Sequence, residues 1–206
     1  HLEEISGIYV PFWLYSCESN GSFSFDATRT HHYTDGDYDV TETEHYLVLR
    51  DGEARFNNIP VDGSSKMDDA YMDAIEPFDY SAITDFHTDY LPGYAAQTYD
   101  EDATACAPRA TARVKNTTIA AIRRTCDYTT LTPRTSKIST TQNSVDYALL
   151  PVWMLTTNWH GKSYHFAING QTGKLIGDLP IDKGRFFSLL AGITIPLGIL
   201  LKLFIF

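Results

Sequence analysis

Residues 147–181, YALLPVWMLTTNWHGKSYHFAINGQTGKLIGDLPI, contain the clearest strand pattern of the chain. β-Branched and aromatic residues dominate it, and glycine-containing turn signals interrupt it at Gly161 and again at residues 169–174. This pattern is typical of short strands joined by tight turns. The stretch therefore predicts a strand–turn–strand–turn–strand unit.

A fainter copy of this unit lies near the N-terminus. Residues 11–13 (PFW) match residues 151–153 (PVW), and Gly21 matches Gly161 at the same offset. The pair Asn20-Gly21 then predicts a hairpin turn, and the proline at position 11 indicates an edge strand or a bulge. Two related hairpins follow from this comparison, and chance similarity between two aromatic strands is the alternative.

Three further signals lie between these units. Asp51-Gly52 separates two strand-like runs and predicts a third hairpin turn. Ser65 with Asp68 resembles a capping box and predicts a short helix that ends near residue 75. Residues 100–127 predict the longest helix, with acidic residues at its positive N-terminus. The apolar stripe expected on that helix comprises Cys106, Ala110, Val114, Ala121, Ile122 and Cys126.

We therefore expect an α+β domain over residues 1–185. Antiparallel β-hairpins in a pseudo-repeat, near residues 5–60 and 128–181, are expected to pack with one longer helix from a helical insert at 66–127.

Residues 186–206, FFSLLAGITIPLGILLKLFIF, predict a C-terminal transmembrane helix. The run is 21 residues long, and about 20 apolar residues span a bilayer. Three basic residues precede it: Lys174, Lys183 and Arg185. The positive-inside rule then places a soluble domain of residues 1–185 in the cytoplasm, anchored by a single span or by the first of several spans.

Charge is divided between the two halves of the chain. Residues 1–102 hold 22 acidic and 4 basic residues, whereas residues 103–206 hold 4 acidic and 12 basic residues. We expect the halves to attract each other within the domain; a basic half that faces an anionic partner is the alternative. The candidate contacts to such a partner are Arg109, Arg113, Lys115, Arg123 and Arg124. Nucleic acid is the less favoured partner, since no recognised binding fold accompanies the charge.

Several kinds of site lack their sequence signals. The three cysteines show no C-x-x-C spacing, which argues against a disulfide framework and a structural zinc site. No H-E-x-x-H, G-x-S-x-G or G-x-x-x-x-G-K-[ST] motif is present. The sequence predicts no catalytic, metal-binding or cofactor-binding residue and no enzymatic activity.

One acidic turn invites a calcium interpretation. Asp35, Asp37 and Asp39 alternate like the first ligands of an EF-hand loop. The template then requires glycine and glutamate where Val40 and Tyr46 stand, so a solvated acidic turn is the preferred interpretation.

Several segments of the sequence resemble a bacterial membrane protein family described as containing a zinc ribbon of the transcription-factor-IIB type. The matching segments are residues 8–13 (IYVPFW), 61–67 (VDGSSKM), 75–80 (IEPFDY), 149–153 (LLPVW), 159–174 (WHGKSYHFAINGQTGK) and 177–180 (GDLP). The resemblance covers nearly the whole chain and implies an N-terminal C-x-x-C…C-x-x-C ribbon before this region, with one or more membrane spans after it. The ribbon is not in this sequence, so the resemblance implies zinc only outside it. Members are often labelled primosomal helicase-like, a label that would require nucleotide-binding motifs.

The expected function is that of a membrane-anchored, non-catalytic scaffold or adaptor. Its partners would be the lipid bilayer and a protein bound through the zinc ribbon. The first alternative is a ligand- or peptide-binding module with an aromatic surface around Trp13, Trp153 and Trp159; the second is a nucleic-acid-associated protein when the ribbon is present. A concave aromatic pocket would favour the binding module.

Overall fold

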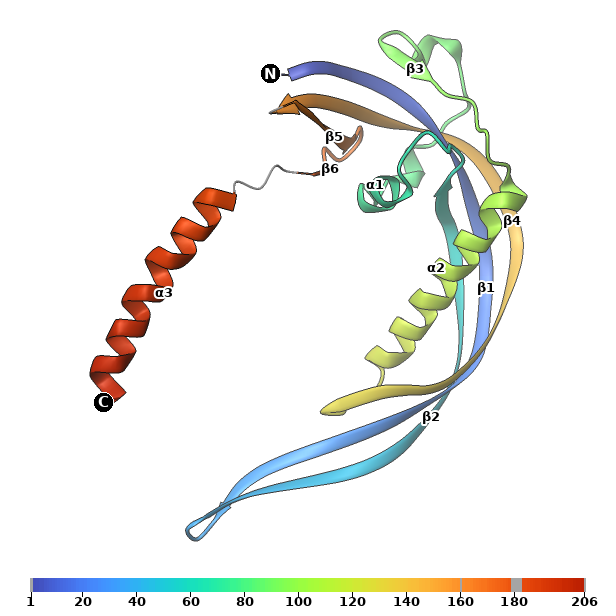
Figure 1. Cartoon of the computed structure of the whole chain (residues 1–206). Coiled ribbons are helices and arrows are strands. Elements are labelled where there is room, and N and C mark those ends of the chain that lie inside the picture. The colour runs from blue at the N-terminus through green and yellow to red at the C-terminus, as the bar shows by residue number, and fades with distance from the viewer. Residues whose placement is uncertain (1, 160, 179–182, 206) are drawn as a thin grey trace.

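A curved antiparallel sheet built on three long strands dominates the computed structural model, which describes residues 2–159, 161–178 and 183–205 (Figure 1). The strands are β1 (Leu2–Asp35), β2 (Tyr38–Asp62), β3 (Tyr94–Ala96), β4 (Thr130–Trp159), β5 (Lys162–Asn169) and β6 (Leu175–Gly177). The order across the sheet is β2-β1-β4-β5-β6, and β3 pairs in parallel with β1. β1 is thus a central strand, paired antiparallel with β2 on one side and β4 on the other.

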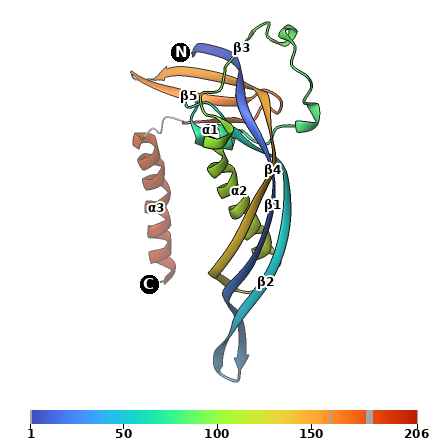
Figure 2. The same ribbon diagram turned by 90° about the vertical axis from the view of Figure 1, so that its right-hand side faces the viewer.

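The main helix lies along the concave side of this sheet (Figures 1 and 2). The helices are α1 (Asp69–Ala74), α2 (Ala103–Arg124) and α3 (Lys183–Ile205), with two short 3-10 helices, η1 (Tyr80–Ala82) and η2 (Thr88–Tyr90). Asp102 caps α2 by accepting a hydrogen bond from the amide of Ala105 at 2.8 Å. The long helix predicted at 100–127 is confirmed, three residues shorter at each end. The short helix begins later than predicted, because Asp68 and not Ser65 caps it.

Successive side chains of β1 alternate between two parts of the core. Phe12 packs edge-on against Phe78, with ring centroids 5.7 Å apart, in a cluster that includes α1. Tyr15 packs instead against α2, as does Cys17. Farther along, the Ser19 hydroxyl lies 3.0 Å from that of Thr118 on α2. The buried residues of α2 are Cys106, Ala110, Val114 and Thr118. Ile122 and Cys126 are partly buried against the cluster around Phe23, so the predicted apolar stripe is confirmed except at the exposed Ala121.

The glycines that predicted two hairpin turns lie in the middle of long strands. Gly21 of β1 pairs directly with Gly52 of β2, and the turn between the strands comes at Gly36, whose φ is +61°. A Cβ at Gly21 would stand 2.6 Å from the carbonyl oxygen of Lys137, and one at Gly52 would stand 2.5 Å from Cδ1 of Ile122. These glycines therefore allow close approach of a neighbouring strand and of α2.

The expected fold class is consequently wrong. Residues 5–25 form part of one strand instead of a hairpin, so they do not repeat the unit at 147–181; Trp13 pairs with Tyr147, whereas Trp153 pairs with Gly7. Gly21 and Gly52 resemble turn glycines in the local sequence, but long-range strand pairing uses them for packing. The strand–turn–strand–turn–strand prediction for 147–181 is confirmed by β4, β5 and β6, although residues 160 and 179–181 lie outside the described ones.

Pro11 does not mark an edge strand, as the sequence had indicated. The pairing of β1 with β2 ends at Phe12, which is opposite Asp62, so the missing N–H of Pro11 lies just past the end of that ladder. The carbonyl of Pro11 still accepts a hydrogen bond from Gly63 N at 2.8 Å. A central strand therefore contains a proline without losing a ladder bond.

The C-terminal helix contradicts the expected membrane span. In the part of the chain that the structure describes, no helix is both long and apolar enough to cross a membrane. Two polar residues, two glycines and one proline lie within the apolar sequence of α3: Ser188, Thr194, Gly192, Gly198 and Pro196. The transmembrane helix expected at 186–206, and the membrane location that rested on it, are therefore wrong; residue 206 itself lies outside the described residues.

The paired glycines give a matched test of this packing. We expect Gly21→Ala to lower the free energy of unfolding by about 1–3 kcal/mol, because the new methyl meets a backbone carbonyl that cannot turn aside. Gly52→Ala should cost less, since the tip of the Ile122 side chain can rotate away. Urea unfolding followed by circular dichroism measures both, and an equal or greater loss in Gly52→Ala would contradict this packing.

Candidate ligand-binding groove

A groove of about 730 Å³ opens between the sheet and the segment that carries η1 and η2. Residues 147–151 of β4 and Tyr9 of β1 form one wall. Residues 82–86 and Tyr90 form the other wall, and Gln171 also lines the groove. The lining is mostly apolar, with phenol rings from three tyrosines and the ring of Phe86. Its size falls in the range of small-molecule and side-chain binding sites.

Polar contacts fix the position of the wall that faces the sheet. Gln171, in the turn between β5 and β6, accepts a hydrogen bond from the amide of Asp79 at 2.8 Å. The buried amide group of Asn169 donates to the carbonyls of Ile75 and Pro77, each at 3.0 Å. Residues 169–174 form the turn that the sequence predicts, and this turn also anchors the groove wall.

Two of the three predicted tryptophans do not line the groove but lie behind residues that do. The Trp13 ring lies 5.2 Å from that of Tyr147, which lines the groove, and its Nε1 donates to the carbonyl of Glu101 at 2.9 Å. The Trp153 ring lies 5.0 Å from Tyr94, which in turn lies 4.9 Å from the groove residue Tyr9.

The third tryptophan, Trp159, is exposed at the end of β4, outside the groove lining. The predicted tryptophans thus lie near the groove, whereas its aromatic lining residues, Tyr9, Phe86, Tyr90 and Tyr147, were not predicted. The signal that could have found two of them is the mixture of aromatic and acidic residues at 78–90.

The electrostatics of the groove favour a neutral or cationic occupant. Asp85 is the one charged side chain among its lining residues. Burial, followed by the neighbouring Tyr99, raises the pKa of Tyr147, so this phenol stays protonated at physiological pH.

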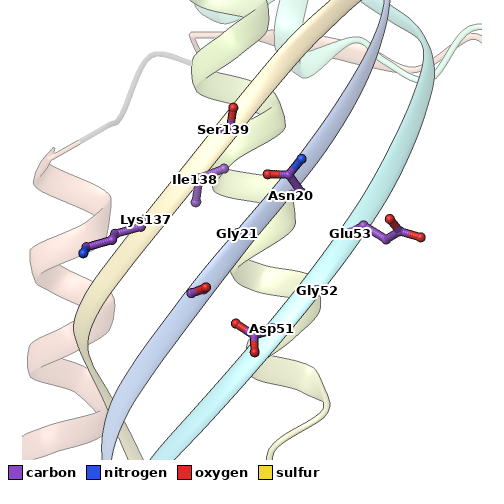
Figure 3. Close-up of a pocket in the computed structure, with 9 residues that line it drawn as sticks. Asn20, Gly21, Asp51, Gly52, Glu53, Lys137, Ile138 and Ser139 are labelled. Carbon is purple, nitrogen blue, oxygen red and sulfur yellow. The ribbon is translucent and has the colours of Figure 1, made fainter.

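A second hollow, of about 800 Å³, lies on the sheet beside Gly21 and Gly52. It is an open depression bordered by three strands, and its charged side chains do not converge: Lys137 and Glu53 project away from each other on the two outer strands (Figure 3). A ligand there would lack a second wall. We therefore take the aromatic groove as the candidate site.

Two of the five basic residues of α2 pair with acidic residues from the first half of the chain. Arg109 bonds to Asp62 at 3.0 Å and to Asp69 at 2.8 Å. Arg113 holds both oxygens of Glu76, at 2.8 and 2.5 Å. The predicted attraction between the two halves is confirmed by these contacts. The other candidate contacts to an anionic partner, Lys115, Arg123 and Arg124, are exposed.

Asp62 is the most perturbed carboxylate of this network. Its residue is 1% exposed, and its Oδ2 atom has no hydrogen-bond partner. Burial raises the pKa of Asp62 to about 6, although the Arg109 guanidinium acts in the opposite direction. Nearby, burial and then the charge of Glu101 raise the pKa of the Cys106 thiol to about 11, which makes it unreactive, as expected of a core cysteine. Among the described residues, no three His, Cys, Asp or Glu side chains cluster to hold a metal ion.

The raised pKa of Asp62 predicts a pH-dependent stability. Because the folded pKa of about 6 exceeds the ordinary value of 3.8, the folded state holds the proton more tightly. The stabilisation is complete below pH 3.8 and is lost as the pH rises through 6. Relative to Asp62→Asn, the wild type should therefore lose about 2 kcal/mol of unfolding free energy between pH 4 and pH 7.

Asp73→Asn is the matched control, because its carboxylate also contacts Arg109, and Arg113 as well, but is 46% exposed. Its effect should stay below about 1 kcal/mol at both pH values. Denaturant titrations of the three proteins provide the comparison, and a wild-type advantage over Asp62→Asn that grows with pH would refute the assignment.

Comparisons with known proteins give one relative without a described function. The chain is 38% identical over 203 residues, 98% of its length, to a protein of Bacillus subtilis (strain 168) named "Uncharacterized protein YdjG". It spans 60% of the length of that relative. No protein-family model matches the chain, so the resemblance to the zinc-ribbon family gains no support there and stays a prediction. No solved structure matches it either.

Proposed function

We propose that this chain is a non-catalytic binding module whose aromatic groove receives an apolar or aromatic group of its ligand. The observation that carries the proposal is the groove of about 730 Å³ between β4 and residues 82–90. A concave aromatic pocket is the feature that favours a binding module over a scaffold. The scaffold role stays a prediction.

The lining supports binding more than acid–base chemistry. Its ionisable side chains are one carboxylate, Asp85, and the phenols of Tyr9, Tyr90 and Tyr147. General acid–base catalysis needs a positioned proton donor and acceptor with pKa values near the working pH. The aromatic rings instead supply contact area with few rotatable bonds, which suits recognition of another apolar or aromatic group.

A small neutral aromatic compound tests the proposal directly. We expect p-cresol to shift the amide NMR signals of Phe86, Tyr90 and Leu149 in the full chain, because these residues line the groove. Phe86→Ala should weaken this binding about fivefold, the loss expected for one aromatic contact.

Tyr38→Ala is the control for surface aromatics. Tyr38 is 77% exposed at the start of β2, outside the groove lining, and its removal should leave the affinity for p-cresol unchanged. Signal shifts confined to other regions, or an unchanged affinity in Phe86→Ala, would refute the groove as the binding site.

A further inference from the structure

We infer that the groove binds an extended basic peptide, which adds as a strand to the free edge of β4 at Tyr147 and Leu149. This inference rests on the proposed function and names the chemical class of its ligand. Three observations support it: the outer edge of β4 pairs with no described strand beside the groove, alternate residues of β4 direct their N–H and C=O groups to that edge, and the opposite wall is acidic.

The outer edge of β4 is uncovered beside the groove. β5 pairs with β4 from Val152 to Trp159, and among the described strands the rest of β4 pairs with β1 alone. Five consecutive residues of β4, 147–151, line the groove. Because successive side chains of a strand point to opposite faces, such a continuous run means that the strand edge itself borders the cavity.

Hydrogen bonding shows which backbone groups point into the groove. Gly170 N donates to the carbonyl of Pro151 at 2.8 Å, so this carbonyl points away from β1. In an antiparallel ladder the N–H and C=O of one residue point to the same side, and the side alternates along the strand. The amide and carbonyl groups of Leu149 and Tyr147 therefore point away from β1, towards the groove.

The proline pattern agrees with this phase. Leu149 is opposite Pro11, and Pro151 is opposite Tyr9. Proline has no N–H to give, so these positions suit pairs that exchange no hydrogen bonds across the β1–β4 ladder. Leu149 consequently keeps its N–H available at the outer edge.

β3 covers the corresponding edge of β1, whereas no described strand covers the outer edge of β4 beside the groove. Where β2 has ended, β3 pairs with β1 in parallel, with Tyr94 opposite Gly7. No described strand does the same for β4 below Val152. An exposed edge is a template for another strand, and a peptide that pairs there would place alternate side chains against Phe86 and Tyr90.

The charge of the outer wall favours a basic peptide. The segment 79–90 carries Asp79, Asp85 and Asp89 and contains no lysine or arginine. It belongs to the half of the chain that holds 22 acidic and 4 basic residues. Lysine side chains on the peptide would complement this field, while its aromatic side chains enter the groove.

The probe is the capped peptide acetyl-Lys-Phe-Thr-Phe-Lys-amide, titrated into the full chain. We expect saturable shifts of the amide NMR signals of Tyr147 and Leu149. Two forms of the peptide, N-methylated at alternate amides, test strand pairing. One form should bind about tenfold more weakly and the other with nearly unchanged affinity, because alternate amides face the edge of β4. Equal affinities of the two forms would overturn the inference.

A variant of the protein tests the same bond from the other side. Leu149→Pro removes the outward N–H at a position where an edge strand accepts proline, and it should weaken peptide binding about tenfold. Leu149→Val retains the N–H and changes only the side chain, so it should weaken peptide binding less than Leu149→Pro does. Peptide affinity unchanged by the proline would refute strand addition.

Two further comparisons test the preference for a basic peptide and separate this inference from the proposed function. Acetyl-Glu-Phe-Thr-Phe-Glu-amide should bind at least about tenfold more weakly than the lysine peptide at low salt, and equal binding would refute the preference for basic peptides. If p-cresol binds in the groove and the lysine peptide does not, the inference fails while the proposed function stands. If p-cresol also fails to bind, the proposed function fails.

Discussion

The two-sided pairing of β1 is the interaction on which the rest of the structure depends. Twisted strands of this length curve when they pair side by side, and α2 lies along the concave side that results (Figure 1). The pairing also fixes where prolines are tolerated: Pro11 and Pro151 occupy positions at which the ladder needs no N–H. The same phase directs the amide of Leu149 outward. The pairing of β1 with β2 and β4 therefore determines the curvature of the sheet, the position of α2 in the core and the open edge beside the groove.

Elements defined by local signals could be predicted from the sequence, whereas those defined by long-range pairing could not. Asp102 caps α2 through a contact three residues away, and Gly161 forms the β4–β5 turn with a φ of +74°; both follow from neighbouring residues. Gly21 and Gly52 give the same local signal as turn glycines, yet they serve the approach of Lys137 and α2, which lie far away in sequence. Composition alone does not separate these two uses of glycine.

The candidate site was predictable only in outline. Aromatic residues around Trp13 and Trp153 indicated the correct region, but the groove itself forms where β1, β4 and residues 82–90 meet, and no spacing in the sequence encodes that meeting. The basic helix was the better-predicted feature, because the acidic excess of residues 1–102 indicated partners within the chain. The apolar C-terminal run gave a wrong prediction, because no helix among the described residues is both long and apolar enough to span a membrane.

Amide hydrogen exchange of the ligand-free chain tests the central claim, that the β4 edge is open beside the groove. Leu149 and Leu150 are adjacent residues of the same type, so their intrinsic exchange rates are close. In the ladder, Leu150 is opposite Val10 and its N–H points to β1, whereas the N–H of Leu149 points to the groove. The amide of Leu149 should therefore exchange at least about tenfold faster than that of Leu150. Equal protection of the two amides would contradict it.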